Sequence, residues 1–133
     1  MAVATVIEAP TKFARRVIAN ATAVPIGTIM KLEDDNTVVV SASNSDPFGG
    51  IAWVEHTANE GVTEMVVALD GRWSITTTAA AIPAGNICSI AGANTVALSV
   101  GTADTIVGTN VGKVLNTIGG GGGTAIVEVG VTG

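Results

Sequence analysis

One strand, turn and strand segment occurs twice in this chain. The stretch AVPIGTIMKLEDDNTVVVS at 23–41 aligns without a gap with AIPAGNICSIAGANTVALS at 81–99, and eight of the nineteen positions are identical. In both copies apolar residues alternate on either side of a short polar turn, which is typical of a β-hairpin. Because one small sheet cannot bury its own apolar face, two similar strand sets predict a body that closes around a core.

We therefore expect an all-β fold, a compact β-barrel or sandwich-like body built from two similar β modules, with an extended N-terminal arm. The 17 Gly and four Pro punctuate short runs rich in Val and Thr, and no long stretch has a helical period. The expected parts of this single compact domain are an arm at 1–21, a first module at 22–78 and a second module at 79–133.

The alternation also predicts which side chains enter the core. These positions are Met30, Leu32, Val38 and Val40 in the first module and Cys88, Ile90, Val96 and Leu98 in the second. Asp70-Gly71 is the strongest short hairpin signal in the chain and predicts that the runs 63–69 and 72–77 pair with each other.

Composition and charge limit the classes of partner. With six basic residues and a net charge of -5, the chain lacks the clustered Lys and Arg of a nucleic-acid surface. No apolar run of about eighteen residues predicts a membrane span, and the N-terminus lacks the pattern of a secretory signal. Only 13% of the residues are charged, against about 25% in an average soluble domain. Such a neutral surface suits a protein that lies against its own copies or a larger body.

The residue types that carry catalysis or bind metals are scarce. The one histidine, His56, is expected to be solvated at a polar strand end, and Cys88 to be a small core residue. The acidic turn at 33–36 lacks the spacing of a calcium loop, and no Lys follows the glycine run at 119–123 as a phosphate loop requires. We therefore expect no enzyme activity, cofactor, metal or small-molecule substrate.

A set of ordered motifs resembles a known family. An opening strand, Pro25-Ile26-Gly27-Thr28-Ile29, is followed by a variable turn, a return strand and Gly50-Ile51-Ala52, and then by a Val-rich strand from Val66 to Gly71. This order resembles that of the bacteriophage capsid cement, or head decoration, proteins. The second module, from IPAGNICSI onward, is similar to the C-terminal half of the longer members, so the resemblance covers most of the chain from about residue 23.

The resemblance implies a structural virion protein. Such a protein is made in the host cytoplasm, binds the outer surface of an icosahedral head as a homotrimer and stabilises the head by bridging major capsid subunits. An N-terminal segment commonly contacts the capsid in these proteins, which implicates Phe13, Arg15 and Arg16.

The residues themselves suggest a second contact and a competing function. The turn formed by Ala91, Gly92, Ala93 and Asn94 has lost the acids of its counterpart at 33–36, so we expect it to face a neighbour at a trimer or capsid interface. The alternative function is a receptor- or glycan-binding module of a phage fibre or adhesin. The presence of only four aromatic residues, two Trp and two Phe, counts against it.

Overall fold

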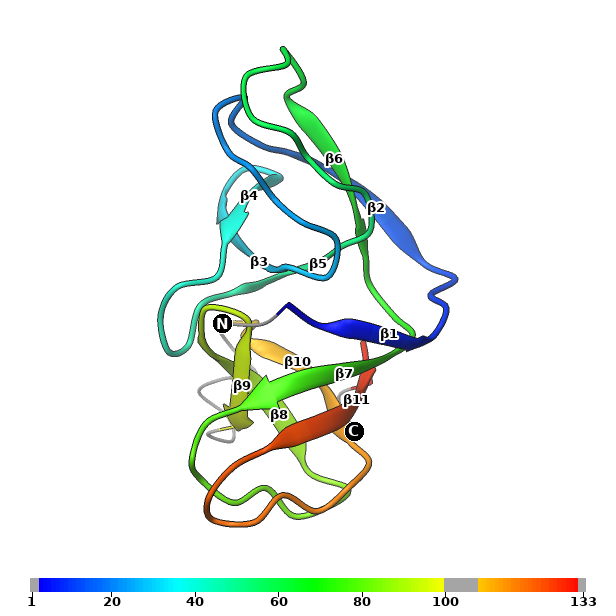
Figure 1. The fold of residues 1–133 in the computed structure, drawn as a ribbon, viewed down its shortest axis with the longest axis vertical. Coiled ribbons are helices and arrows are strands. Elements are labelled where there is room, and N and C mark those ends of the chain that lie inside the picture. Colours follow the sequence, from blue (N-terminus) through cyan, green and yellow to red (C-terminus); the bar gives the residue numbers. More distant parts are fainter. Residues whose placement is uncertain (1–2, 100–107, 132–133) are drawn as a thin grey trace.

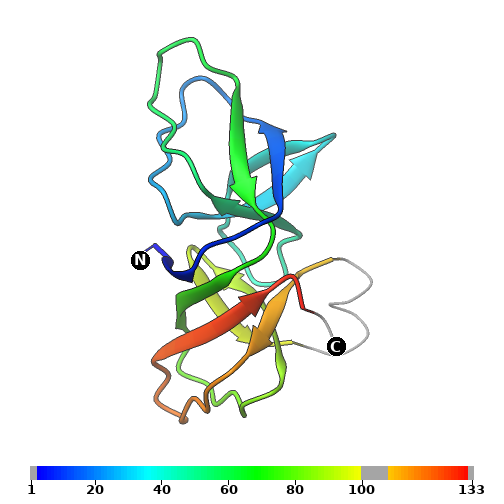
Figure 2. The same ribbon diagram turned by 90° about the vertical axis from the view of Figure 1, so that its right-hand side faces the viewer.

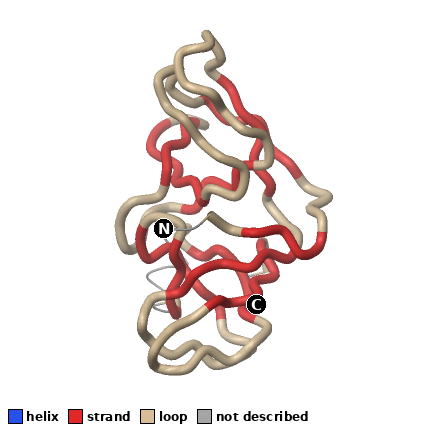
Figure 3. Tube along the Cα trace, in the orientation of Figure 1, coloured by secondary structure: helices blue, strands red, loops and turns tan. Residues whose placement is uncertain are grey.

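The structure is a computed structural model that describes residues 3–99 and 108–131. Every regular element within these residues is a β-strand, which confirms the all-β prediction, and Figure 3 shows strands and loops only. The strands form two closed five-stranded barrels, drawn one above the other in Figure 1, with one further strand on the second barrel. The predicted barrel-like body built from two similar strand sets is therefore confirmed.

The first barrel contains five strands in the order β2-β4-β3-β5-β6. Its members are β2 (Phe13–Val17), β3 (Ile29–Asp34), β4 (Thr37–Val40), β5 (Phe48–Ala52) and β6 (Glu64–Ala68). The strands pair antiparallel except where β2 meets β4 in parallel at one position, Val17 with Thr37. This single parallel contact closes the barrel.

The second barrel repeats this plan in the order β7-β11-β10-β8-β9. Its members are β7 (Arg72–Thr77), β8 (Ile87–Gly92), β9 (Thr95–Leu98), β10 (Asn110–Val114) and β11 (Thr124–Val129). A parallel contact again closes the barrel, where Thr76 pairs with Thr95 and Thr77 with Val96.

The two barrels also match in register. Ala52 pairs with Val67 in the first barrel as Val114 pairs with Val127 in the second. One residue further along, Ala68 of β6 pairs with Phe13 of β2, as Glu128 of β11 pairs with Arg72 of β7. Three outward-facing positions of these two strands therefore correspond, namely Phe13 with Arg72, Arg15 with Ser74, and Val17 with Thr76.

The N-terminal segment lies against both barrels. Ala4 N–H donates to Gly27 O of the first barrel at 2.8 Å, and β1 (Thr5–Glu8) then pairs antiparallel with β7 of the second. Beyond β1, Thr11 N–H donates to an Asp70 carboxylate oxygen at 2.7 Å. The part of the chain predicted to be an arm thus supplies the edge strand of one barrel and, in β2, a wall of the other (Figure 2).

The prediction that Asp70-Gly71 forms a hairpin is wrong. The flanking strands β6 and β7 belong to different barrels, and the dipeptide connects the two. Gly71 does adopt the left-handed conformation expected of such a turn, with φ +94°. However, β2 and β5 occupy both edges of β6, so β7 has no edge to pair with. The barrels therefore divide the chain before β7, earlier than the boundary at residue 78 expected from the repeat.

The core consists of two clusters that follow the barrels. Met30 and Val38 are buried inside the first barrel, and Cys88, Ile90 and Val96 are buried in the second, as predicted. The larger cluster also includes residues of the first barrel that face the second, namely Ile29, Ile51 and Ala68. Shared apolar packing therefore joins the barrels.

One core prediction fails at the end of a strand. Leu98 is 41% exposed, because it ends β9 beyond the two positions at which β7 covers that strand.

Candidate functional site

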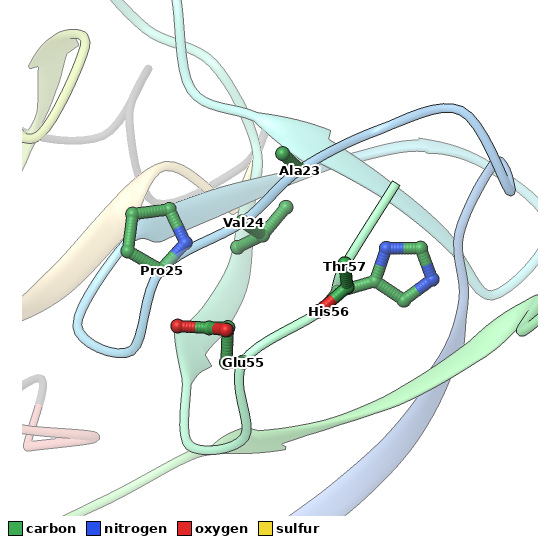
Figure 4. A pocket seen from close by; sticks show the side chains of 6 residues that line it. All are labelled: Ala23, Val24, Pro25, Glu55, His56 and Thr57. Atoms are coloured by element: carbon green, nitrogen blue, oxygen red, sulfur yellow. The ribbon is translucent and has the colours of Figure 1, made fainter. Parts of the chain in front are cut away.

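The only histidine is buried, so the prediction of a solvated His56 is wrong. Its side chain is 3% exposed, with Nδ1 2.6 Å from Thr22 O and Nε2 2.7 Å from Val62 O. Figure 4 shows the ring turned away from Glu55, its neighbour in a pocket of about 240 Å³. His56 therefore ties together two loops of the first barrel.

Cys88 is fully buried, which confirms its predicted place in the core. Burial raises the pKa of its thiol to about 12, so the nucleophilic thiolate is not populated at neutral pH. Within residues 3–99 and 108–131, no three His, Cys, Asp or Glu side chains lie together in a way that could hold a metal ion. The same residues include no helix long and apolar enough to cross a membrane.

The turn at 91–94 packs against the first barrel of the same chain. Asn94 is 7% exposed, and its Oδ1 accepts a hydrogen bond from Ile29 N–H at 2.8 Å. Ser41 Oγ–H donates to Gly92 O at 3.1 Å and accepts from Asn94 N–H at 3.2 Å. Ala91 forms an isolated bridge with Asn44. The neighbour that this turn contacts is thus the first barrel, and Ala93 remains exposed for any further partner.

The structure brings Phe13 and Arg15 to one outer face and turns Arg16 away from it. Phe13 is 44% exposed, with its ring centroid 5.8 Å from that of Trp53, and Arg15 extends into solvent. The Arg16 guanidinium instead donates to Gly49 O at 3.3 Å and to Asn36 Oδ1 at 2.8 Å. Its place is set by contacts within the barrel, so Phe13 and Arg15 alone of the three are available to a partner.

Apolar side chains gather around Phe13 and Arg15. Val17, Val54 and Val62 are 39%, 49% and 46% exposed. A groove of about 300 Å³ runs beside them and is lined by Arg15, Val54, Val62, Glu64, Met65 and Val66. We call Phe13, Arg15, Val17, Val54, Val62 and Val66 the first-barrel face.

Four members of this face, Val17, Val54, Val62 and Val66, were not predicted as contact residues from the sequence. Val54 lies after β5 and Val62 before β6. Because neither residue is in a regular strand, the inward and outward alternation of strand side chains could not predict that they are exposed. The available signal was two large apolar residues at the ends of the polar segment from Glu55 to Gly61.

Comparison with models of known protein families finds no match for this chain, and no curated protein matches it either.

Proposed function

We propose that this chain is a capsid decoration, or cement, protein that binds the outer surface of an icosahedral phage head as a trimer. The observation that carries the proposal is the contrast between the outer sides of β2 and β7. Phe13, Arg15 and Val17 are exposed on β2, whereas Arg72, Ser74 and Thr76 at the corresponding positions are polar and half-buried. Two barrels with the same plan thus present different chemistry at these three corresponding positions.

An apolar face with a charged rim is suited to binding another protein. Contacts of this kind gain free energy from apolar burial, and the rim charge selects the partner. In the proposed trimer each copy supplies one such face, so three modest contacts act together and the combined affinity greatly exceeds that of one copy. Bridging neighbouring capsid subunits would oppose their separation under internal DNA pressure.

Binding to heads tests the proposal directly. The purified protein would be mixed with expanded, undecorated heads, and co-sedimentation and the temperature of thermal rupture would be measured. We expect saturable binding and a higher rupture temperature. A protein that leaves the heads unbound and unstabilised would contradict the proposal, and saturable binding to cells or glycans would then favour a receptor-binding module.

A further inference from the structure

The two barrels differ in how many strands cover one corresponding edge. In the second barrel, β7 pairs with β9 at Thr76 and Thr77 and with β1 along the half that begins at Arg72. In the first barrel, β2 pairs with β4 only at Val17. Among the residues that the structure describes, the half of β2 from Phe13 to Arg15 therefore has a strand partner on one side only.

The backbone groups on this open edge can be identified from the alternation of a strand. Ile18 N–H donates to Thr63 O, directly before β6, at 3.0 Å. Because backbone groups alternate in direction along a strand, the even-numbered residues of β2 direct their N–H and C=O groups toward β6. Val17 N–H donates the other way, to Asn36 O at 2.8 Å, and Asn36 Nδ2–H donates to Arg15 O at 3.1 Å. The open edge thus presents the N–H groups of Phe13 and Arg15 and the C=O of Phe13.

The charges on the covered edge indicate what an added strand carries. Arg72 of β7 lies 3.8 Å from Glu128 of β11 and 3.8 Å from Glu8 of the added strand β1. Arg15 of β2 lies 3.8 Å from Glu64 of β6 and stands at the next outward position along β2 from Phe13, the counterpart of Arg72. The Arg15 side chain is 72% exposed, so an acidic residue on an added strand can reach it as Glu8 of β1 reaches Arg72.

We infer that the open edge of β2, from Phe13 to Arg15, accepts an extended acidic strand of the partner protein, in the place that β1 takes on β7. Backbone hydrogen bonds supply the attachment, as in other cases of strand addition, and Arg15 selects the acidic side chain. The added strand also covers the exposed side chain of Phe13, which lies on the same side of β2 as Arg15. The inference rests on the proposed function in one respect, that the partner strand belongs to a capsid subunit.

Hydrogen exchange of single amides on undecorated heads tests this inference. The full chain is bound to the heads and exposed to D₂O, exchange is quenched, the heads are dissociated, and each amide is read by NMR. We expect the Phe13 and Arg15 amides to exchange at least tenfold more slowly when bound. The Ala14 and Arg16 amides face β6 and should be protected in both states, which provides an internal control.

The outcomes separate the two proposals. Protein that fails to sediment with the heads overturns the proposed function and the inference together. Protein that sediments while the Phe13 and Arg15 amides exchange at the free rate overturns the inference alone.

A neutral variant tests the charge. Arg15→Gln should weaken binding to heads on the order of tenfold, while the urea midpoint of the free protein stays near that of the unmodified chain. Lys113→Gln, which makes the same charge change on β10 of the second barrel, is the matched control and should bind normally. Equal loss of affinity in both variants would show that Arg15 acts only through net charge and would overturn its assigned role.

Discussion

The first barrel exposes Phe13, Arg15 and Val17 on the outer side of β2, whereas the second presents a polar surface on the corresponding side of β7 and covers part of it with β1. The strand order and register are the same in both barrels. This difference indicates that backbone pairing sets the barrel, while side chains on its outer surface are free to serve different contacts. A duplicated fold can therefore carry two different surfaces.

The hairpin turns at 33–36 and 91–94 also share a backbone conformation while their side chains make different contacts. Asn36 and Asn94 both adopt a left-handed conformation, with φ of 48° and 54°, which Asn tolerates better than most residues. Their side chains differ in partner. Asn36 bonds to Arg15 and Arg16 of its own barrel, whereas Asn94 bonds to Ile29 of the other barrel. The turn geometry is shared, and the contact made by the side chain is not.

The largest expected difference between the barrels is at one interior strand position, held by Trp73 in β7 and by Ala14 in β2. Trp73 is fully buried, and its indole N–H donates to Asp70 O at 3.0 Å. Trp73→Ala should therefore lower the free energy of unfolding by about 3–5 kcal/mol in urea titrations. Ala14→Gly, the control at the matching position, should cost about 1 kcal/mol. Similar losses from both would mean that the second barrel is not packed around this tryptophan.

The next comparison uses two glycines with the same backbone conformation. Gly27 and Gly85 have φ of +93° and +91°, so replacement by Ala strains both turns equally. A Cβ at Gly27 would also collide with the Ala4 carbonyl, whereas nothing lies within 4 Å at Gly85. We expect Gly27→Ala to destabilise the protein by about 1–3 kcal/mol more than Gly85→Ala in thermal or urea unfolding. Equal effects would contradict the position of the N-terminal segment across Gly27.

The sequence predicted the two Asn turns but placed Gly27 in an opening strand, whereas this residue lies in a turn before β3. It also did not predict the full set of strands. The repeat begins at Ala23, and it correctly placed Gly27, Gly85 and both Asn turns in equivalent positions. It could not show that β2 belongs to the first barrel, because the side chains of β2 and β7 share no pattern and only their register makes them equivalent. Likewise, Asp70-Gly71 has the local chemistry of a hairpin, but competition for strand edges decides the pairing.

The candidate surface was predictable only in part. Phe13 and Arg15 were implicated by a resemblance, and they lie on the exposed face. Arg16 was implicated with them, although strand alternation turns its side chain toward Gly49 and Asn36.

The two asparagines provide a third comparison. Asn94→Gly preserves the left-handed turn but leaves the buried Ile29 N–H without its acceptor, which should cost about 1–3 kcal/mol. Asn36→Gly removes exposed hydrogen bonds and should cost about 0.5–1 kcal/mol in the same urea titrations. Faster exchange of the Ile29 amide in the Asn94 variant alone would locate the loss at the junction of the barrels. An unchanged Ile29 amide would argue against this contact.

A smaller effect is expected at Asp70, which joins the N-terminal segment to the connection between the barrels. The Lys12 backbone N–H holds the pKa of the Asp70 carboxyl below its usual 3.8, burial opposes the shift, and hydrogen bonds from Thr11 add to it. A lowered pKa in the folded state means that the stabilisation is complete above pH 3.8 and is lost as the pH falls through the lower folded value.

Asp70→Ala should therefore flatten the decline of unfolding free energy between about pH 5 and pH 2 and reduce stability modestly at pH 7. Asp35→Ala, in an exposed turn, is the control and should retain the decline of the unmodified protein. Urea titrations across this pH range measure both. If Asp70→Ala retains the same decline, Asp70 does not hold the N-terminal segment in the way its hydrogen bonds indicate.

The smallest expected effect on folding comes from substitutions at Ala93 and Asp35, which are exposed at matching positions of the two hairpin turns. Lys at either position should change the free energy of unfolding by less than about 0.5 kcal/mol, because neither side chain is buried. If the turn at 91–94 also faces a partner in the proposed trimer or on the capsid, Ala93→Lys should impair assembly, since a long charged side chain would be forced into that contact. Asp35→Lys should assemble normally. Light scattering and co-sedimentation with undecorated heads measure both, and equal tolerance would mean that the inner contact with the first barrel is the whole role of this turn.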